Sequence, residues 1–218
     1  MYLIKKRKDN FVDNLQSLDS ISKEFSLDKS SSFHDYADYY DKTLSHLRNK
    51  KIRMIEIGIG TWEEGESSMK DHWNNKDDPI KKNYKPGNSL RAWKKYFYNL
   101  DYILGIDVKK DCMFEEPNIK TELLDSMKES SRTIIKQKYG DKFDVILDDG
   151  LHNVEAQVKT FLSFWPLLKQ KGIYLIEDIS DPNELKDELQ KHTTNKIHIE
   201  KTNGMKISND SSIIKIVK

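Results

Sequence analysis

The chain has 218 residues, of which 36% are hydrophobic and 33% charged, with 37 Lys and Arg against 36 Asp and Glu. The resulting net charge of +1 argues against a protein that works mainly as a nucleic-acid-binding patch. The single cysteine, Cys112, excludes an intramolecular disulfide and a zinc site built from cysteines. No apolar run reaches the ~20 residues of a membrane helix. We therefore expect one cytoplasmic domain without a membrane partner.

The first fifty residues are mostly helical by pattern, with a polar break at 28–32. We expect residues 1–50 to form a helical segment that packs on a main domain of residues 51–218. Within that domain the stretch 63–88 is polar, contains prolines and lacks periodicity. A loop this long in a compact domain is usually functional or mobile, although a solvated insertion explains it equally well.

Four short β-branched runs that end in acidic residues or glycine carry the clearest strand signal. They cover residues 52–58, 102–107, 143–149 and 172–178, and helical patterns over 89–98, 123–139 and 153–168 lie between them. Two further short strands, 196–200 and 212–217, are expected to pair at one edge. This alternation predicts an α/β fold with a mostly parallel, twisted sheet, helices on both faces and an antiparallel C-terminal edge.

The first strands lead into residues suited to a nucleoside-type ligand, since ligands of such sheets bind beyond the carboxyl ends of the strands. Glu56 is followed by Gly58 and Gly60, and glycine lets backbone approach a ligand closely. Asp107 ends the second strand, where a carboxylate can accept hydrogen bonds from a ribose diol. Asp125 follows a further short apolar stretch. The glycines could instead serve only a tight turn, because the third glycine of the dinucleotide fingerprint is missing.

Acidic residues also close the third and fourth strands, and a histidine follows the first pair. These residues are Asp148, Asp149, His152, Glu177 and Asp178. Carboxylates crowded at neighbouring strand ends repel one another, and a divalent cation such as magnesium relieves that repulsion through hard oxygen ligands. A histidine beside the cation is suited to take a proton from a bound hydroxyl. The alternative is that Asp148 and Asp178 cap helices and that His152 is a surface residue.

The order of these motifs resembles a known family. GIG after a strand, SLRAWKKYF, GID, FDVILDDGLH and FWPLLKQKGIYLIEDI occur in the sequence as they do in class I S-adenosylmethionine-dependent methyltransferases. More narrowly, the pair DDG-x-H and IED resembles the magnesium-dependent sugar O-methyltransferases of macrolide biosynthesis. The resemblance implies a Rossmann-like fold and two cofactors, S-adenosyl-L-methionine and Mg²⁺.

The resemblance also implies roles for particular residues. Asp149, Glu177 and Asp178 would hold the metal, and His152 would be the general base. The remaining matched positions would bind or cover the cofactor, and they are Lys29, Tyr36, Glu56, Gly58, Ser89, Asp107, Asp125, Ser126 and Asp148. Segment 1–50 would thus pack over the cofactor. Ser30 stands where the family tends to have glycine, and Arg91 could bind near the cofactor or form a structural salt bridge.

These roles predict methyl transfer to a hydroxyl of a sugar-bearing small molecule, a sugar nucleotide or a glycan. A vicinal diol on the metal is also found in catechols, so a catechol-type O-methyltransferase remains an alternative. A catalytically silent methyltransferase-like binding subunit and a nucleic-acid methyltransferase are further alternatives, although the charge disfavours nucleic acid. The sequence leaves open whether the chain forms a homo-oligomer.

Overall fold

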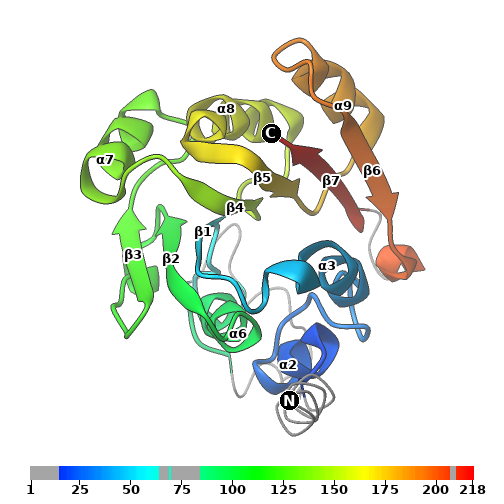
Figure 1. The fold of residues 1–218 in the computed structure, drawn as a ribbon. Coiled ribbons are helices and arrows are strands. Elements are labelled where there is room, and N and C mark those ends of the chain that lie inside the picture. The colour runs from blue at the N-terminus through cyan, green and yellow to red at the C-terminus, as the bar shows by residue number, and fades with distance from the viewer. Residues whose placement is uncertain (1–14, 64–68, 70–83, 207–209) are drawn as a thin grey trace, which may run out of the picture.

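A single seven-stranded sheet forms the centre of the molecule (Figure 1). The computed structural model describes residues 15–63, 69, 84–206 and 210–218. The strands are β1 (Ile52–Ile57), β2 (Leu100–Asp107), β3 (Ile119–Leu123), β4 (Phe143–Asp148), β5 (Leu168–Ile176), β6 (Ile197–Lys201) and β7 (Ser212–Val217). They lie in the order β3-β2-β1-β4-β5-β7-β6, parallel from β3 to β5, with β7 antiparallel to β5 and β6. The sheet predicted from the strand pattern is therefore confirmed, including its antiparallel edge.

Helices cover both faces of this sheet (Figure 1). The α-helices are α2 (Leu18–Glu24), α3 (Ala37–Leu44), α6 (Asn88–Tyr96), α7 (Glu129–Tyr139), α8 (Val154–Phe164) and α9 (Pro182–Gln190). The first three lie on one face and the last three on the other, and each group shares a separate cluster of buried hydrophobic residues with the sheet. In the described part of the chain, no helix combines the length and apolarity needed to cross a membrane.

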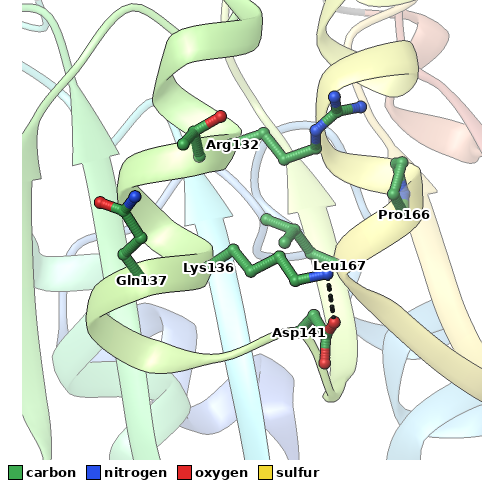
Figure 2. A pocket seen from close by; sticks show the side chains of 7 residues that line it. Arg132, Lys136, Gln137, Asp141, Pro166 and Leu167 are labelled. Atoms are coloured by element: carbon green, nitrogen blue, oxygen red, sulfur yellow. Dashed lines mark ion pairs between the residues drawn. The ribbon is translucent and has the colours of Figure 1, made fainter.

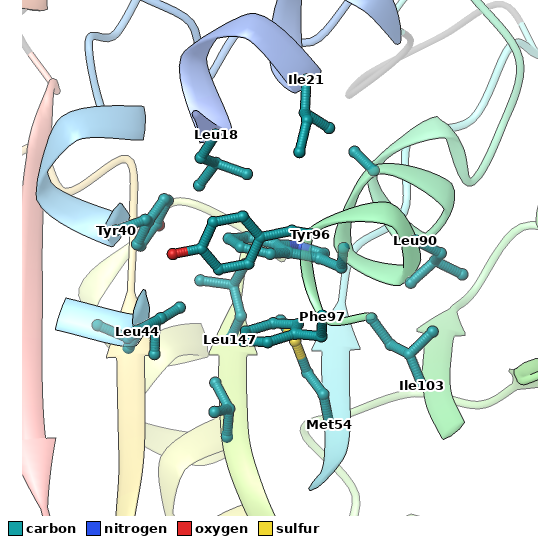
Figure 3. Packing of buried hydrophobic residues seen from close by; sticks show 14 of the residues in the cluster. Leu18, Ile21, Tyr40, Leu44, Met54, Leu90, Tyr96, Phe97, Ile103 and Leu147 are labelled. Atoms are coloured by element: carbon teal, nitrogen blue, oxygen red, sulfur yellow. The ribbon is translucent and has the colours of Figure 1, made fainter. Parts of the chain in front are cut away.

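The N-terminal helices are part of the core on their face of the sheet. Figure 3 shows Leu18 of α2 and Tyr40 of α3 packed with Tyr96 at the end of α6 and with Met54 of β1. The Tyr96 hydroxyl donates to Asp41 of α3 at 2.7 Å, so a partly buried hydrogen bond reinforces the apolar contacts. The described part of segment 1–50 thus packs on the sheet, and its covering of a cofactor stays a prediction.

The sequence prediction was wrong where β3 and α7 meet. Residues 123–139 were expected to be helical, but Leu123 ends strand β3 and α7 begins at Glu129. β3 lies at the edge of the sheet, and of its residues only Ile119 is buried. An edge strand that buries one side chain has no sustained apolar pattern, which is why the period-based reading missed it.

The prediction also missed detail around β5. The expected helix 153–168 stops at Phe164, because a 3₁₀ turn containing Pro166 follows and β5 begins at Leu168, before the predicted 172. Helix α9 was not predicted at all. Its N-cap, Asp181, accepts from the backbone N–H groups of Asn183 and Glu184, and Pro182 begins the helix, so a start signal was present in the sequence.

Candidate active site

The acidic residues of the candidate site come together because β4 and β5 are parallel neighbours. Asp148 of β4 pairs with Ile176 of β5, and the residues that follow them are Asp149 after β4 and Glu177 after β5. The Glu177 N–H donates to the Asp148 carbonyl at 3.0 Å, which continues the pairing past the strand ends. The carboxylates of Asp149, Glu177 and Asp178 therefore leave the sheet at one place.

His152 lies beside two of these carboxylates. Its Nε2 atom is 3.6 Å from Asp149 Oδ1 and 3.7 Å from Asp178 Oδ2, and the ligand atoms of these three residues all lie within 4.8 Å of one another. The side chain is 38% exposed, so a ligand could reach it from solvent. Burial lowers the pKa of His152, but the hydrogen bond to Asp149 and the charge of Asp178 outweigh it and raise that pKa to about 9.

The carboxyl groups themselves are strongly perturbed. Burial, followed by the charge of Asp149, raises the pKa of Asp178 to about 6 and that of Glu177 well above its ordinary value. Burial disfavours the charged form of Asp149 as well. The charge of Lys29, with the hydrogen bond and charge of His152, outweighs burial and lowers the pKa of the Asp149 carboxyl. Two buried carboxyl groups and the partly exposed Asp149 meet at one point, where positive charge is needed and a cation would provide it.

The N-terminal segment contacts the same carboxylates. The Lys29 ammonium is 2.7 Å from Asp149 Oδ2 and also bonds Glu177 Oε1. The Tyr36 hydroxyl donates to Asp178 Oδ1 at 2.6 Å, and the Tyr40 hydroxyl donates to Glu177 Oε2 at 2.5 Å. Lys29 and Tyr36 were expected at the cofactor, whereas the structure places both on the acidic cluster.

Two other contacts escaped the sequence analysis. Tyr40 was not predicted, although it follows Tyr36 by four residues and so lies on the same side of α3. His34 was not among the predicted site residues either, but its Nδ1 atom lies 3.7 Å from Asp178 Oδ1 and its ring stacks on Tyr36. Nothing in the sequence around Tyr40 or His34 indicated that their side chains contact the acidic cluster.

The helix-capping alternative is wrong for both acids. The N-cap of α8 is Asn153, whose side chain accepts from the Ala156 N–H at 2.9 Å. The N-cap of α9 is Asp181. Asp148 and Asp178 therefore cap neither helix. Asp178 instead has a left-handed backbone with φ of 55°, which aspartate tolerates better than most residues.

The glycine-containing loop after β1 passes close to the acidic cluster. Gly58 has φ of 77°, and a Cβ atom there would lie 1.9 Å from the Asp149 carbonyl oxygen. Only glycine fits so close a crossing with this backbone conformation. Asp107 supports the same loop, since its two carboxylate oxygens accept from the N–H groups of Ile59 at 3.0 Å and Lys109 at 2.9 Å.

Glu56 and Asp148 are buried carboxyl groups with oxygens that lack a partner. Glu56 Oε1 accepts from the Trp93 indole N–H at 3.4 Å, but Oε2 has no hydrogen-bond partner among the described residues. Asp148 Oδ1 accepts from the Gly150 N–H, and its Oδ2 is similarly unpartnered within the described ranges. Burial raises the pKa of each to about 7. Unpaired buried carboxyl oxygens are costly, and they mark places where a ligand could donate.

The remaining predicted cofactor residues lie apart from the acidic cluster. Asp125 accepts from the Met127 N–H at 3.0 Å in the loop after β3, and Ser126 Oγ lies 3.0 Å from Thr160 Oγ1 of α8. Ser89 lies in the first turn of α6. A hydrogen bond from its side chain offsets part of the rise in the pKa of Glu56 that burial causes. The structure thus brings Ser89 to Glu56 but leaves Asp125 and Ser126 near α7 and α8.

Other candidates from the sequence have structural surroundings. Arg91 forms an ion pair with Glu116 at 2.8 Å, which favours its structural reading. Cys112 is buried, as a packing residue would be. The expected insertion 63–88, with His72 and Trp73, lies largely outside the described residues.

A surface cavity of about 490 Å³ lies elsewhere, beside α7 and the 3₁₀ turn before β5 (Figure 2). Lys136 and Asp141 form an ion pair of 2.8 Å within it. None of the candidate site residues lines this cavity.

The sequence of the chain is similar to those of curated O-methyltransferases. No family model matches the chain. The chain is 30% identical over 162 residues to demethylmacrocin O-methyltransferase of Streptomyces fradiae and 29% identical over 163 residues to mycinamicin VI 2''-O-methyltransferase of Micromonospora griseorubida. Each alignment covers 74% of this chain and 36% of the relative, so the chain spans about a third of the length of these curated relatives.

Solved structures give the same fold. The methyltransferase MycE of mycinamycin biosynthesis, solved in complex with Mg, SAH and mycinamycin VI, superposes with a TM-score of 0.67 and 23% identity, over 93% of this chain and 54% of that one. Human methyltransferase-like protein 13, solved with SAH, gives a TM-score of 0.51 and 12% identity over 80% of this chain and 74% of that one. The chain therefore has the class I methyltransferase fold, and its sequence resembles the macrolide sugar O-methyltransferases.

Proposed function

We propose that this chain is an S-adenosylmethionine- and Mg²⁺-dependent O-methyltransferase that transfers a methyl group to a hydroxyl of a sugar-bearing acceptor. One observation carries the proposal: Asp149, Glu177 and Asp178 meet at the ends of β4 and β5, with His152 Nε2 within 3.7 Å of two of them. The relatives suggest the substrate class, because two of them are named as O-methyltransferases of a rhamnosyl tetracenomycin and of L-olivosyl-oleandolide, which both carry a sugar.

The residues present fit both cofactors. Three carboxylates form an all-oxygen donor set, which suits Mg²⁺ rather than zinc. The unpartnered oxygen of buried Glu56 would accept a donor from the methionine end of S-adenosylmethionine, beside Gly58 and Ser89. Asp107 would accept from the ribose hydroxyls with lone pairs that its two backbone contacts leave free. The buried Asp148 and the pair Asp125 and Ser126 would lie toward the rest of the nucleoside.

When bound, S-adenosylmethionine supplies a methyl group activated on sulfur, and Mg²⁺ supplies a positive charge that orients and acidifies an acceptor hydroxyl. Asp149, Glu177 and Asp178 would hold the metal. His152 Nε2 would take the proton of the acceptor hydroxyl, which makes the hydroxyl oxygen nucleophilic toward the methyl carbon, with S-adenosylhomocysteine as the leaving group. Without a cation, Asp149 and Asp178 lie 3.6 and 3.7 Å from Nε2 and hold a proton there. A cation on these two carboxylates would offset their negative charge, lower the pKa of His152 and free the Nε2 lone pair for the proton of the acceptor.

The segment 1–50 contributes to the site in this proposal. Lys29, Tyr36 and Tyr40 contact the carboxylates of the site, so the described part of this segment would act as its cover. The proposed domain organisation is thus one methyltransferase domain of residues 51–218 with this cover.

The test is a methyl-transfer assay with S-adenosylmethionine labelled on the methyl carbon. Acceptors would be desmethyl macrolide glycosides, sugar nucleotides and, as the competing class, catechols. We expect labelled product with a sugar-bearing acceptor, loss of transfer in excess EDTA and recovery with Mg²⁺. Transfer to catechols alone would contradict the acceptor class, and full activity in EDTA would contradict the metal.

A further inference from the structure

Lys29 places a positive charge at the centre of the acidic cluster. Its side chain is 4% exposed, and its ammonium bonds Asp149 Oδ2 and Glu177 Oε1 together. These are oxygens of two of the three proposed metal ligands. An ammonium and a divalent cation cannot both sit on the same pair of oxygens at bonding distance.

Charge explains why the ammonium lies there. The Lys29 side chain is buried, and its ammonium contacts the carboxylates of Asp149 and Glu177 directly. A buried group with so many acidic neighbours stays protonated and acts as their counter-charge. The counter-charge is thus supplied by the chain itself.

Each of the other oxygens of the three carboxylates lies beside a tyrosine or histidine side chain. Tyr40 donates to Glu177 Oε2, and Tyr36 donates to Asp178 Oδ1. The two oxygens that remain, Asp149 Oδ1 and Asp178 Oδ2, both face His152 Nε2. A cation that binds all three acids must therefore approach Glu177 beside the Lys29 ammonium, and the repulsion between the two positive charges favours exchange of the ammonium for the cation.

Hydrogen bonds fix the backbone at Lys29, whereas the lysine side chain has several rotatable bonds beyond that anchor. The Lys29 carbonyl accepts from the Ala37 N–H at 2.9 Å, and the Asp28 carbonyl accepts from the His34 N–H at 3.0 Å. These bonds tie the turn to the start of α3. The four-carbon arm with its single charged atom can swing about that anchor, as lysine does more readily than arginine.

We propose that Lys29 is the built-in counter-ion of the cation site, and that a divalent cation displaces its ammonium from Glu177 while Tyr36 and Tyr40 hold the carboxylates in position. The proposal rests on the proposed function for the location of the metal. Lys29 is thus a positioning residue that keeps the acids together before the metal binds, and it competes with the metal for their oxygens.

The test is Mg²⁺ titration of the full chain by calorimetry. We expect Lys29→Met to bind Mg²⁺ about tenfold more tightly than the wild type, because removal of a buried positive charge raises the attraction of the carboxylates for another cation. Without metal the same variant should melt at a lower temperature, and Mg²⁺ should raise its melting temperature more than that of the wild type.

Lys29→Arg carries the test without removing the charge. Its guanidinium can hold two carboxylates with paired hydrogen bonds, so we expect weaker Mg²⁺ binding than in the wild type. Tyr40→Phe should weaken Mg²⁺ binding about tenfold, because groups that orient metal ligands have effects of that size. Tyr96→Phe is the matched control, since it removes a tyrosine–carboxylate bond to Asp41 away from the cluster, and it should leave Mg²⁺ affinity unchanged.

Equal or weaker Mg²⁺ binding by Lys29→Met, or equal or tighter binding by Lys29→Arg, would overturn the exchange. A loss of affinity in every variant, Tyr96→Phe included, would also overturn it, because the effect would then be structural. The methyl-transfer assay separates the two proposals. A wild-type chain that binds Mg²⁺ but transfers no methyl group would refute the proposed function and leave the exchange at Lys29 standing.

Discussion

Replacement of Glu56 by glutamine should make the protein more stable and its cofactor binding weaker. Glu56 is fully buried, one of its oxygens has no partner among the described residues, and burial raises its pKa to about 7 from an ordinary 4.5. Glutamine has nearly the same shape but cannot ionise. The change therefore removes a buried charge without opening a cavity.

The sign and size follow from proton linkage. The unfolded chain loses the Glu56 proton near pH 4.5 and the folded chain loses it near pH 7, so the folded state binds more protons between these values and its stability falls as pH rises through that window. From pH 5 to pH 8 the calculated loss at this residue is about 2.5 kcal/mol. Glu56→Gln does not show this pH-dependent loss of stability, because glutamine does not ionise. Other buried acids, such as Asp148, change the free energy of unfolding equally in both proteins, so their effect cancels in the difference.

The assay is urea unfolding of the wild type and Glu56→Gln at pH 5 and pH 8, with the free energy of unfolding compared at each pH. Between pH 5 and pH 8, we expect the free energy of unfolding of the variant to increase by about 2.5 kcal/mol relative to that of the wild type. Calorimetry with S-adenosylhomocysteine should show weaker binding by the variant, because a carboxylate acceptor is lost. A difference that does not change with pH would refute the burial argument, and unchanged affinity would remove Glu56 from the cofactor site.

Three further predictions test other parts of the molecule. His152→Ala should lower methyl transfer about 10²–10⁴-fold with unchanged S-adenosylhomocysteine affinity, and an active variant would exclude it as the base. Gly58→Ala should cost about 2–4 kcal/mol in urea unfolding, since its Cβ would lie 1.9 Å from the Asp149 carbonyl oxygen at a positive φ; a neutral change would refute the close crossing. Asp181→Ala should cost about 1 kcal/mol in the same assay through loss of the α9 N-cap, and Asp187→Ala, at an exposed acid inside the same helix, is the comparison that affects no cap.

The sheet was predictable from the sequence because its central strands are short apolar runs ending in acids. β4 and β5 each bury nearly every residue at their carboxyl ends, so neighbouring parallel strands had to bring Asp149 and Glu177 to the same edge. β3 was missed for the opposite reason, since it is a polar edge strand. The helix start at Asp181 was present in the sequence but was not used.

The contacts of the N-terminal segment could not have been read from local pattern. Tyr40 and Glu177 are 137 residues apart, and Lys29 and Glu177 are 148 residues apart. Periodicity places a side chain on a face of its own element, but it does not say which distant strand end that face meets. The family resemblance brought Lys29 and Tyr36 near the site, and the structure alone connects them to particular carboxylates.

The gathering of Asp149, Glu177 and Asp178 around a divalent cation is tested most directly by soaking crystals of the protein with Mn²⁺ and recording anomalous diffraction. We predict a single strong anomalous peak within coordination distance of an oxygen from each of the three residues, with His152 adjacent and the Lys29 ammonium moved off Glu177. A peak at another position, or none at saturating Mn²⁺, would contradict the metal site and with it the proposed reaction.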